Sequence, residues 1–325
     1  MNSLFLRKFS VALAVGLCVG AVGCTADGSE KESFVASDGS STPTTLRTPA
    51  AGTSINQPAR NTLYFCPRGP LPLPPLTKPD TPWVQGTTIT IADIPYVEGE
   101  VSWDAEFELT VTETERRMKG NGLPNHPTGM FPVQEGTEAY NYYSALPVEG
   151  YENAAAIPVG PYDLDVTIPR NPVVNEEPTC VDSIFTGVVT QTGASWHADV
   201  AIGDMINLLD PVAGLPMDSC WGHPYAEQYH YHGYSWKCFP DQGEPGVHSP
   251  LFGYAIDGFG VFGPLGEDGV MVDNDELDEC HGHTHVIEWD GEMKEMYHYH
   301  VNNQYPYSIG CFRGTPVELP ENLQH

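Results

Sequence analysis

The tetrapeptide Tyr-His-Tyr-His occurs twice in this chain, at residues 229–232 and 297–300. Successive side chains of a β-strand point to opposite faces, so each copy would carry two tyrosines on one face and two histidines on the other. Tyrosine is frequent in strands that pack against a core. The repeat therefore predicts two strands, each with an aromatic face toward the core and an imidazole face on the other side.

The sequence around the second copy predicts a β-hairpin. The dipeptide Asp-Gly at 290–291 is a strong signal for a two-residue turn, and it would place Trp289 opposite Glu292. In that register His283 lies opposite His298. One face of the hairpin would then carry five imidazoles and one thioether, from His281, His283, His285, His298, His300 and Met296.

Other segments also have strand patterns. Apolar and polar residues alternate at 101–111 and 162–168, and apolar runs broken by glycine occur at 183–191 and 251–263. Only 203–210 has a helical pattern. We therefore expect a mostly β fold, an antiparallel sandwich-like arrangement or two packed sheets with few short helices.

The N-terminal region predicts export. Residues 1–23 combine Arg7 and Lys8 with an apolar run too short for a spanning helix, and Cys24 follows in a sequence similar to a bacterial lipobox. We expect a signal peptide of the lipoprotein type and a membrane anchor through lipid on Cys24. The location would be the bacterial cell envelope, as an outer-membrane or cell-surface lipoprotein; the alternative is an ordinary signal peptide and a secreted protein.

Composition divides the rest of the chain. Residues 24–82 are rich in Ser, Thr and Pro and predict a flexible tether, whereas 83–325 would form the β-rich domain. The chain has 43 acidic and 14 basic residues, a net charge of −29. Such a surface repels nucleic acid, so we expect no nucleic-acid partner.

Six cysteines remain after the signal region, an even number that predicts disulfides in an exported chain. Two pairs would bracket the two Tyr-His-Tyr-His copies, and the third pair is then left over. The expected disulfides are Cys220–Cys238, Cys280–Cys311 and Cys66–Cys180.

Two histidines on one face of a strand can reach a single metal ion, and neutral imidazole suits copper and zinc. We therefore interpret the two copies as strands that present four histidines, His230, His232, His298 and His300, to one site. His126, His283 and Asp257 are auxiliary candidates. Copper or zinc is the expected ion, and Met296 favours copper.

Two other interpretations remain open. The same site could serve a metal-dependent enzyme, a hydrolase or an oxidoreductase, if it kept an open coordination position and a nearby base. Alternatively, the histidines are structural and the acidic chain is a surface or adhesion module. The sequence contains no Gly-x-Ser-x-Gly, phosphate-loop or dinucleotide-binding motif that would point to a different chemistry.

Four segments, 121–132, 218–238, 248–264 and 277–316, resemble the YHYH protein family of secreted bacterial proteins. The resemblance extends over about residues 105–316 and implies that both tetrapeptides matter, without implying a reaction. The positions that fall on its motifs are His126, His223, His230, His232, Asp257, Asp278, Glu279, Cys280, His283, His298, His300 and Cys311.

Overall fold

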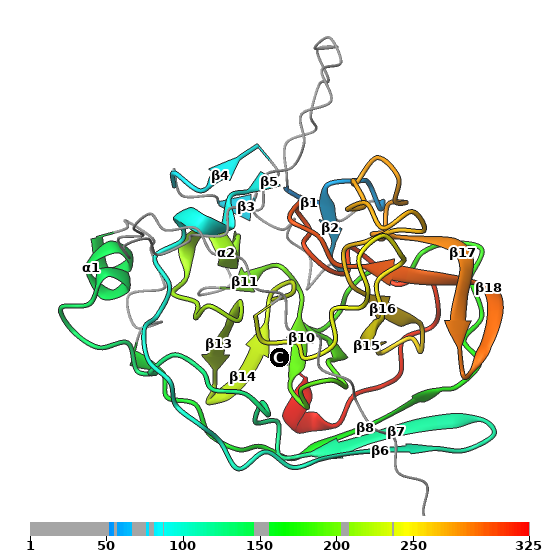
Figure 1. Cartoon of the computed structure of the whole chain (residues 1–325), viewed down its shortest axis with the longest axis horizontal. Helices are drawn as coiled ribbons and strands as arrows, with labels where there is room; N and C mark the ends of the chain where they lie inside the picture. Colours follow the sequence, from blue (N-terminus) through cyan, green and yellow to red (C-terminus); the bar gives the residue numbers. More distant parts are fainter. Residues whose placement is uncertain are drawn as a thin grey trace, which may run out of the picture. The chain divides into compact units, whose positions relative to one another are not determined.

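The computed structural model describes residues 52–54, 57–66, 76–77, 81–86, 88–145, 156–202, 208–235 and 237–324. The fold is mostly β, as the alternating patterns predict, with several sheets and few short helices (Figure 1). Within these ranges, no helix is both long and apolar enough to cross a membrane. The signal peptide, the lipid site at Cys24 and most of the tether lie outside the described residues and stay predictions.

An eight-stranded sheet forms the centre of the described fold. In the order of their pairing, its strands are β13 (Gly222–Tyr225), β14 (Gln228–Tyr231), β10 (Ser195–His197), β9 (Phe185–Val188), β15 (Leu251–Ala255), β16 (Gly260–Phe262), β18 (Glu292–His300) and β17 (Gly282–Trp289).

This sheet consists of two halves with the same connectivity. In chain order, the first half is β9, β10, β13 and β14, and the second half is β15, β16, β17 and β18. In each half the first two strands pair antiparallel, the second and fourth pair parallel, and the last two form an antiparallel hairpin. The halves meet where β9 pairs antiparallel with β15. The two tetrapeptides therefore occupy equivalent strands, β14 and β18.

The same turn precedes the hairpin in both halves. Its sequence is Asp-x-Cys-x-Gly-His, at 218–223 and at 278–283. In each copy one oxygen of the aspartate accepts hydrogen bonds from the backbone amides of the cysteine and the glycine, and from the first tyrosine of the tetrapeptide. The residue before the glycine has a left-handed backbone, with φ of 61° at Trp221 and 74° at His281. A shared sequence thus produces a shared local structure.

Smaller sheets surround the main one. β6 (Phe107–Val111), β7 (Glu115–Gly120) and β8 (Leu164–Pro169) form an antiparallel meander. Alternating burial along β8 confirms the strand predicted at 162–168, whereas at 101–111 the strand begins only at Phe107. The remaining strands are β1 (Gly52–Ser54), β2 (Thr62–Tyr64), β3 (Leu76–Thr77), β4 (Val84–Gln85), β5 (Thr88–Ile89), β11 (Ala201–Ile202) and β12 (Leu208–Leu209).

The helices differ from the prediction. The segment predicted to be helical, 203–210, contributes β12 at Leu208–Leu209, and its first five residues lie outside the described ranges. The described α-helices are α1 (Glu138–Ala145) and α2 (Pro211–Gly214), with 3-10 turns at Ile91–Asp93 and Glu321–Leu323. The side chain of Asp210 caps α2, which explains why that helix starts just after the predicted segment.

All three predicted disulfides are present, Cys66–Cys180, Cys220–Cys238 and Cys280–Cys311. The first of them ties the segment that ends at Cys66 to Cys180. Leu63 and Phe65 are fully buried beside it. Residues 57–66 therefore belong to the fold, although their composition had assigned them to the tether.

Candidate metal centres

The hairpin of β17 and β18 has the predicted register. Trp289 lies opposite Glu292 and His283 opposite His298, with Asp290 and Gly291 in the turn at positive φ. His281 is the exception, because the strand begins one residue after it and its left-handed backbone turns it away from the alternation. Its ring bonds the carbonyl oxygen of His300 and the side chain of Asn274 instead of joining the histidine face.

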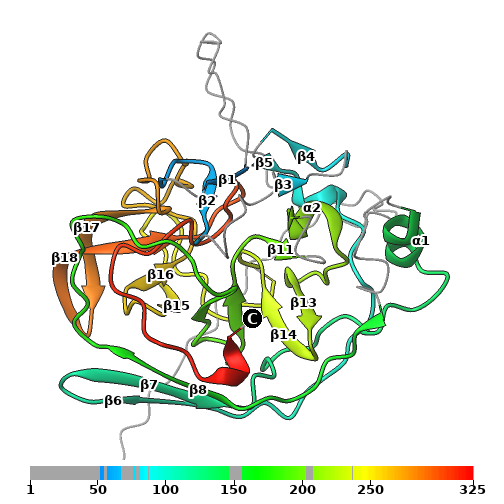
Figure 2. The ribbon, with the colours of Figure 1, turned by 180° about the vertical axis from the view of Figure 1, so that it is seen from behind.

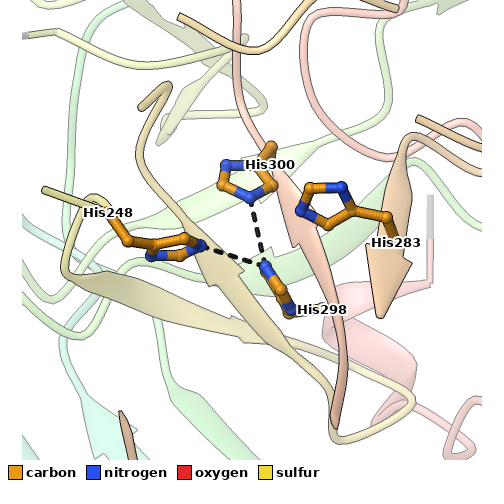
Figure 3. A group of neighbouring side chains, drawn as sticks. All are labelled: His248, His283, His298 and His300. Carbon is orange, nitrogen blue, oxygen red and sulfur yellow. Dashed lines mark hydrogen bonds between the residues drawn. The ribbon is translucent and has the colours of Figure 1, made fainter. Parts of the chain in front are cut away.

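Four histidines converge on this hairpin face, from three different segments. We call His248, His283, His298 and His300 the second cluster; each offers a ring nitrogen within 4.8 Å of those of the others (Figure 3). The Nε2 atom of His298 lies 3.1 Å from the Nε2 atoms of both His248 and His300. His283 Nε2 is buried and has no hydrogen-bond partner among the described residues.

The other ring nitrogen fixes the tautomer of three of these histidines. Nδ1 of His298, His300 and His248 donates to the backbone carbonyls of Met296, Gly263 and Ser249, respectively. A carbonyl oxygen can only accept a hydrogen bond, so each Nδ1 carries the ring proton. Each Nε2 is then unprotonated and presents a lone pair. The lone pair of His298 faces those of His248 and His300 at 3.1 Å, and lone pairs cannot hydrogen-bond to each other. A cation bound among them would satisfy all three.

Burial keeps the rings neutral. Desolvation lowers the pKa of His298 to about 3 and that of His283 to about 4, and lowers that of His300 well below its usual value. The neighbouring histidines lower these pKa values further. Neutral imidazoles are the form that binds metal ions, so the cluster is prepared for a ligand role near neutral pH.

The first half contains an equivalent group. We call His223, His230 and His232 the first cluster; all three are buried, and their ligand atoms lie within 4.8 Å of one another. Nδ1 of His230 donates to the carbonyl oxygen of Gln228, while its Nε2 lies 3.2 Å from Nε2 of His232. His223 faces His230 across the hairpin, as His283 faces His298. Burial lowers the pKa of each of these histidines, that of His232 to about 3.

The interpretation that both tetrapeptides supply one site is wrong. Four strands separate β14 from β18 in the sheet, and five steps of about 4.8 Å amount to roughly 24 Å. Figures 1 and 2 show the two hairpins well apart from opposite sides. A metal ion held by imidazoles needs ligand atoms about 2 Å from itself. The four predicted core ligands therefore divide into two pairs, one in each cluster.

Two of the auxiliary candidates lie on the tyrosine side of these strands, away from both clusters. His126 bonds the hydroxyl of Tyr231 through Nε2, at 2.6 Å. Asp257 accepts from the hydroxyl of Tyr299, also at 2.6 Å, and from two backbone amides. These contacts make His126 and Asp257 partners of the tyrosines, and only His283 of the three joins a cluster. His126 also lies 3.4 Å from the sulfur of Cys220, but that cysteine is in a disulfide and is no thiolate ligand.

Two further side chains of the predicted face fall outside the second cluster. His285 pairs with Glu267, with 2.7 Å between Nδ1 and the carboxylate. Met296 contributes its backbone carbonyl oxygen to His298, and its side chain is buried. The observed donor set of the second cluster is therefore nitrogen only.

Sequence reasoning missed two cluster members as ligands, His223 and His248. His223 was detectable, because Asp-x-Cys-x-Gly-His at 218–223 repeats at 278–283 with the histidine in the same place. His248 comes from the segment just before β15, with no local pattern, and reaches the cluster through tertiary structure.

The fold and its histidines define a mostly β protein with two equivalent histidine clusters. Residues 165–269 match the family model of the YHYH protein, which confirms the resemblance over the whole first half of the sheet and the start of the second. The matched region contains the first tetrapeptide and ends before the second. Comparisons with curated proteins and with solved structures found no match.

Proposed function

We propose that this chain is an exported, lipid-anchored protein that binds transition-metal ions at two histidine centres, one in each half of the main sheet. The convergence of the Nε2 atoms in the second cluster is the observation that carries the proposal. Each of three rings donates its Nδ1 proton to a backbone carbonyl, and the lone pairs point into the same small space.

A purely structural role for these histidines is harder to reconcile with that geometry. In a polar network that only stabilises a core, donors face acceptors, and each buried group is satisfied. Here acceptors face acceptors, and protonation of one ring to supply a donor is opposed by burial. A metal ion resolves the conflict, and the backbone carbonyls are the outer partners that metal-bound histidines usually have.

The donor set limits the metal and the chemistry. Imidazole nitrogen suits zinc and copper, and the oxygen-preferring ions magnesium and calcium fit poorly. Four convergent histidines are enough to fill a tetrahedral site, as in structural centres. This favours binding, storage or transfer of the ion over catalysis at the second cluster.

Metal analysis of the purified mature protein tests the proposal. The protein is stripped with chelator, reloaded separately with Zn²⁺ and Cu²⁺, and assayed for bound metal by mass spectrometry. We expect two ions per chain with submicromolar affinity. A stripped protein that takes up neither ion would refute the proposal.

The lipid anchor has a separate test. Substitution Cys24→Ser should move the protein from the membrane fraction to the soluble periplasm or medium, because it removes the residue that is expected to carry the lipid. A protein whose membrane association is unchanged by this substitution would not be anchored through Cys24.

A further inference from the structure

A buried carboxylate faces the first cluster from outside its ligand set. Oδ1 of Asp199 lies 3.4 Å from Nδ1 of His232, and both side chains are almost completely buried. Neither of these two atoms has a hydrogen-bond partner among the described residues. They face each other, at a distance slightly longer than a hydrogen bond.

The second oxygen of this carboxylate is firmly held. Oδ2 of Asp199 accepts hydrogen bonds from both the backbone amide and the hydroxyl of Ser308, at 3.1 and 2.9 Å. Ser308 follows β18 and so belongs to the second half of the fold. The second half therefore fixes the carboxylate that faces the first cluster.

We propose that Asp199 is a positioning residue for the first cluster, which orients His232 and holds its proton on Nδ1 so that Nε2 faces the metal ion. This role rests on the proposed function. Nε2 of His232 lies 3.2 Å from Nε2 of His230, while the other ring nitrogen of His232 faces Asp199. A carboxylate on the far nitrogen of a metal-bound histidine fixes the ring and raises its basicity.

The electrostatics are consistent with this role. A divalent ion among the imidazoles would favour the ionised carboxylate, because it places positive charge close to the buried group. In the second cluster His248, His298 and His300 have neutral carbonyls in this place, so the carboxylate is a feature of the first cluster.

The test uses the full mature chain with the second cluster removed by His298→Gln, so that the first cluster is measured alone. Asp199→Asn is added, and zinc affinity is measured by competition with a chromophoric chelator. We expect binding weaker by about 10- to 100-fold. Asp199→Glu should restore part of the loss, because it keeps the carboxylate.

Two controls separate positioning from a general effect on the fold. Asp257→Asn removes another buried carboxylate, which lies on the tyrosine side of the second half, and it should leave the affinity of the first cluster unchanged. In a second background, His230→Gln removes the first cluster, and Asp199→Asn should then have no effect on the second. If Asp199→Asn prevents folding, Ser308→Ala tests the same carboxylate, because it removes the hydroxyl that donates a hydrogen bond to Asp199. This variant should weaken the zinc affinity of the first cluster severalfold.

The outcomes distinguish the two proposals. Unchanged affinity in Asp199→Asn, or an equal loss at both clusters, would overturn the positioning role and leave metal binding intact. A parent protein that binds no zinc would overturn the proposed function itself, and this role with it.

Discussion

The two histidine clusters have the same framework and different surroundings. Both clusters lie on a hairpin that follows an Asp-x-Cys-x-Gly-His turn. In both, the two histidines of the tetrapeptide have their Nε2 atoms 3.1–3.2 Å apart. The register of the parallel strands is also similar, because the third residue of each tetrapeptide is paired in both halves: Tyr231 with Trp196, and Tyr299 with Val261. The framework is therefore what the repeated sequence encodes.

The residues around that framework have diverged. His197 follows Trp196, and its ring stacks on that of His230 with the ring centroids 3.7 Å apart. Phe262 follows Val261, and its ring meets that of His298 edge-on with the centroids 5.0 Å apart. The first cluster is closed, since all of its histidines are buried and a carboxylate backs it. In the second cluster His248 and His283 are half-buried. Under the proposed function, we therefore expect the first cluster to release a bound ion more slowly than the second.

The largest expected effect separates the two clusters by stoichiometry. His298→Ala should reduce the bound metal from two ions per chain to one, with a loss of more than about 100-fold in affinity at the second cluster, because a ligand matters more than an outer partner. His230→Ala should do the same at the first cluster. Metal content and competition titration measure both.

His285→Ala is the matched control for these variants. His285 lies next to His283 but pairs with Glu267, so its loss should leave two ions bound. A protein that loses both ions on either single substitution would show that the clusters are one cooperative unit, against the separation in the sheet.

The second effect concerns rates. Added to the protein with both ions bound, a strong chelator should remove one ion quickly and the other at least about tenfold more slowly, because only the second cluster has ligands that reach the surface. Stopped-flow absorbance with a coloured chelator resolves the two phases. In His298→Ala the fast phase should disappear; if the slow phase disappears instead, the expected order of release is reversed.

Part of the second cluster could be predicted because its geometry is local. The Asp-Gly turn at 290–291 sets the hairpin register, and strand alternation then places His283 and His298 together. His281 departed from this pattern since its backbone is left-handed, which alternation cannot anticipate. The disulfides could also be paired correctly, because two of them close around the tetrapeptides.

The number of sites could not be predicted in the same way. Two identical motifs on separate strands fit one site or two, and the choice depends on how many strands lie between them. That order follows from parallel pairings, β10 with β14 and β16 with β18, which join strands distant in sequence. His248 was missed for the same reason, since it lies 50 residues from His298, the cluster member that its ring contacts.

The metal-free protein should become less stable as the pH falls. Histidines in the unfolded chain have a pKa near 6.5 and take up protons below it, whereas burial holds the pKa of His232 and His298 at about 3 in the folded state. The unfolded state then binds more protons, so acidification favours unfolding. Between pH 8 and pH 5 each such histidine should cost about 2 kcal/mol of unfolding free energy.

Urea denaturation of the stripped protein at a series of pH values checks this prediction, and it can be used to compare the clusters. Replacing His230 or His298 with Gln should reduce the slope of stability against pH by about one proton in each case. The loaded protein should show a higher midpoint throughout the range in which the metal stays bound. A stability that does not change between pH 8 and pH 5 would mean that the rings are not held neutral.

The smallest expected effect compares the turns that support the two clusters. The hydroxyl of Tyr229 donates to Asp218, which is almost completely buried, and that of Tyr297 donates to Asp278, which is partly exposed and lies 3.6 Å from Nε of Arg313. Tyr229→Phe leaves a buried carboxylate short of a donor and should cost about 1–3 kcal/mol. Tyr297→Phe should cost about 1 kcal/mol or less, because water and the nearby guanidinium can take over. Urea denaturation at neutral pH measures both variants. Equal losses would show that the shared turn, and not the burial of its aspartate, determines the stability of each hairpin.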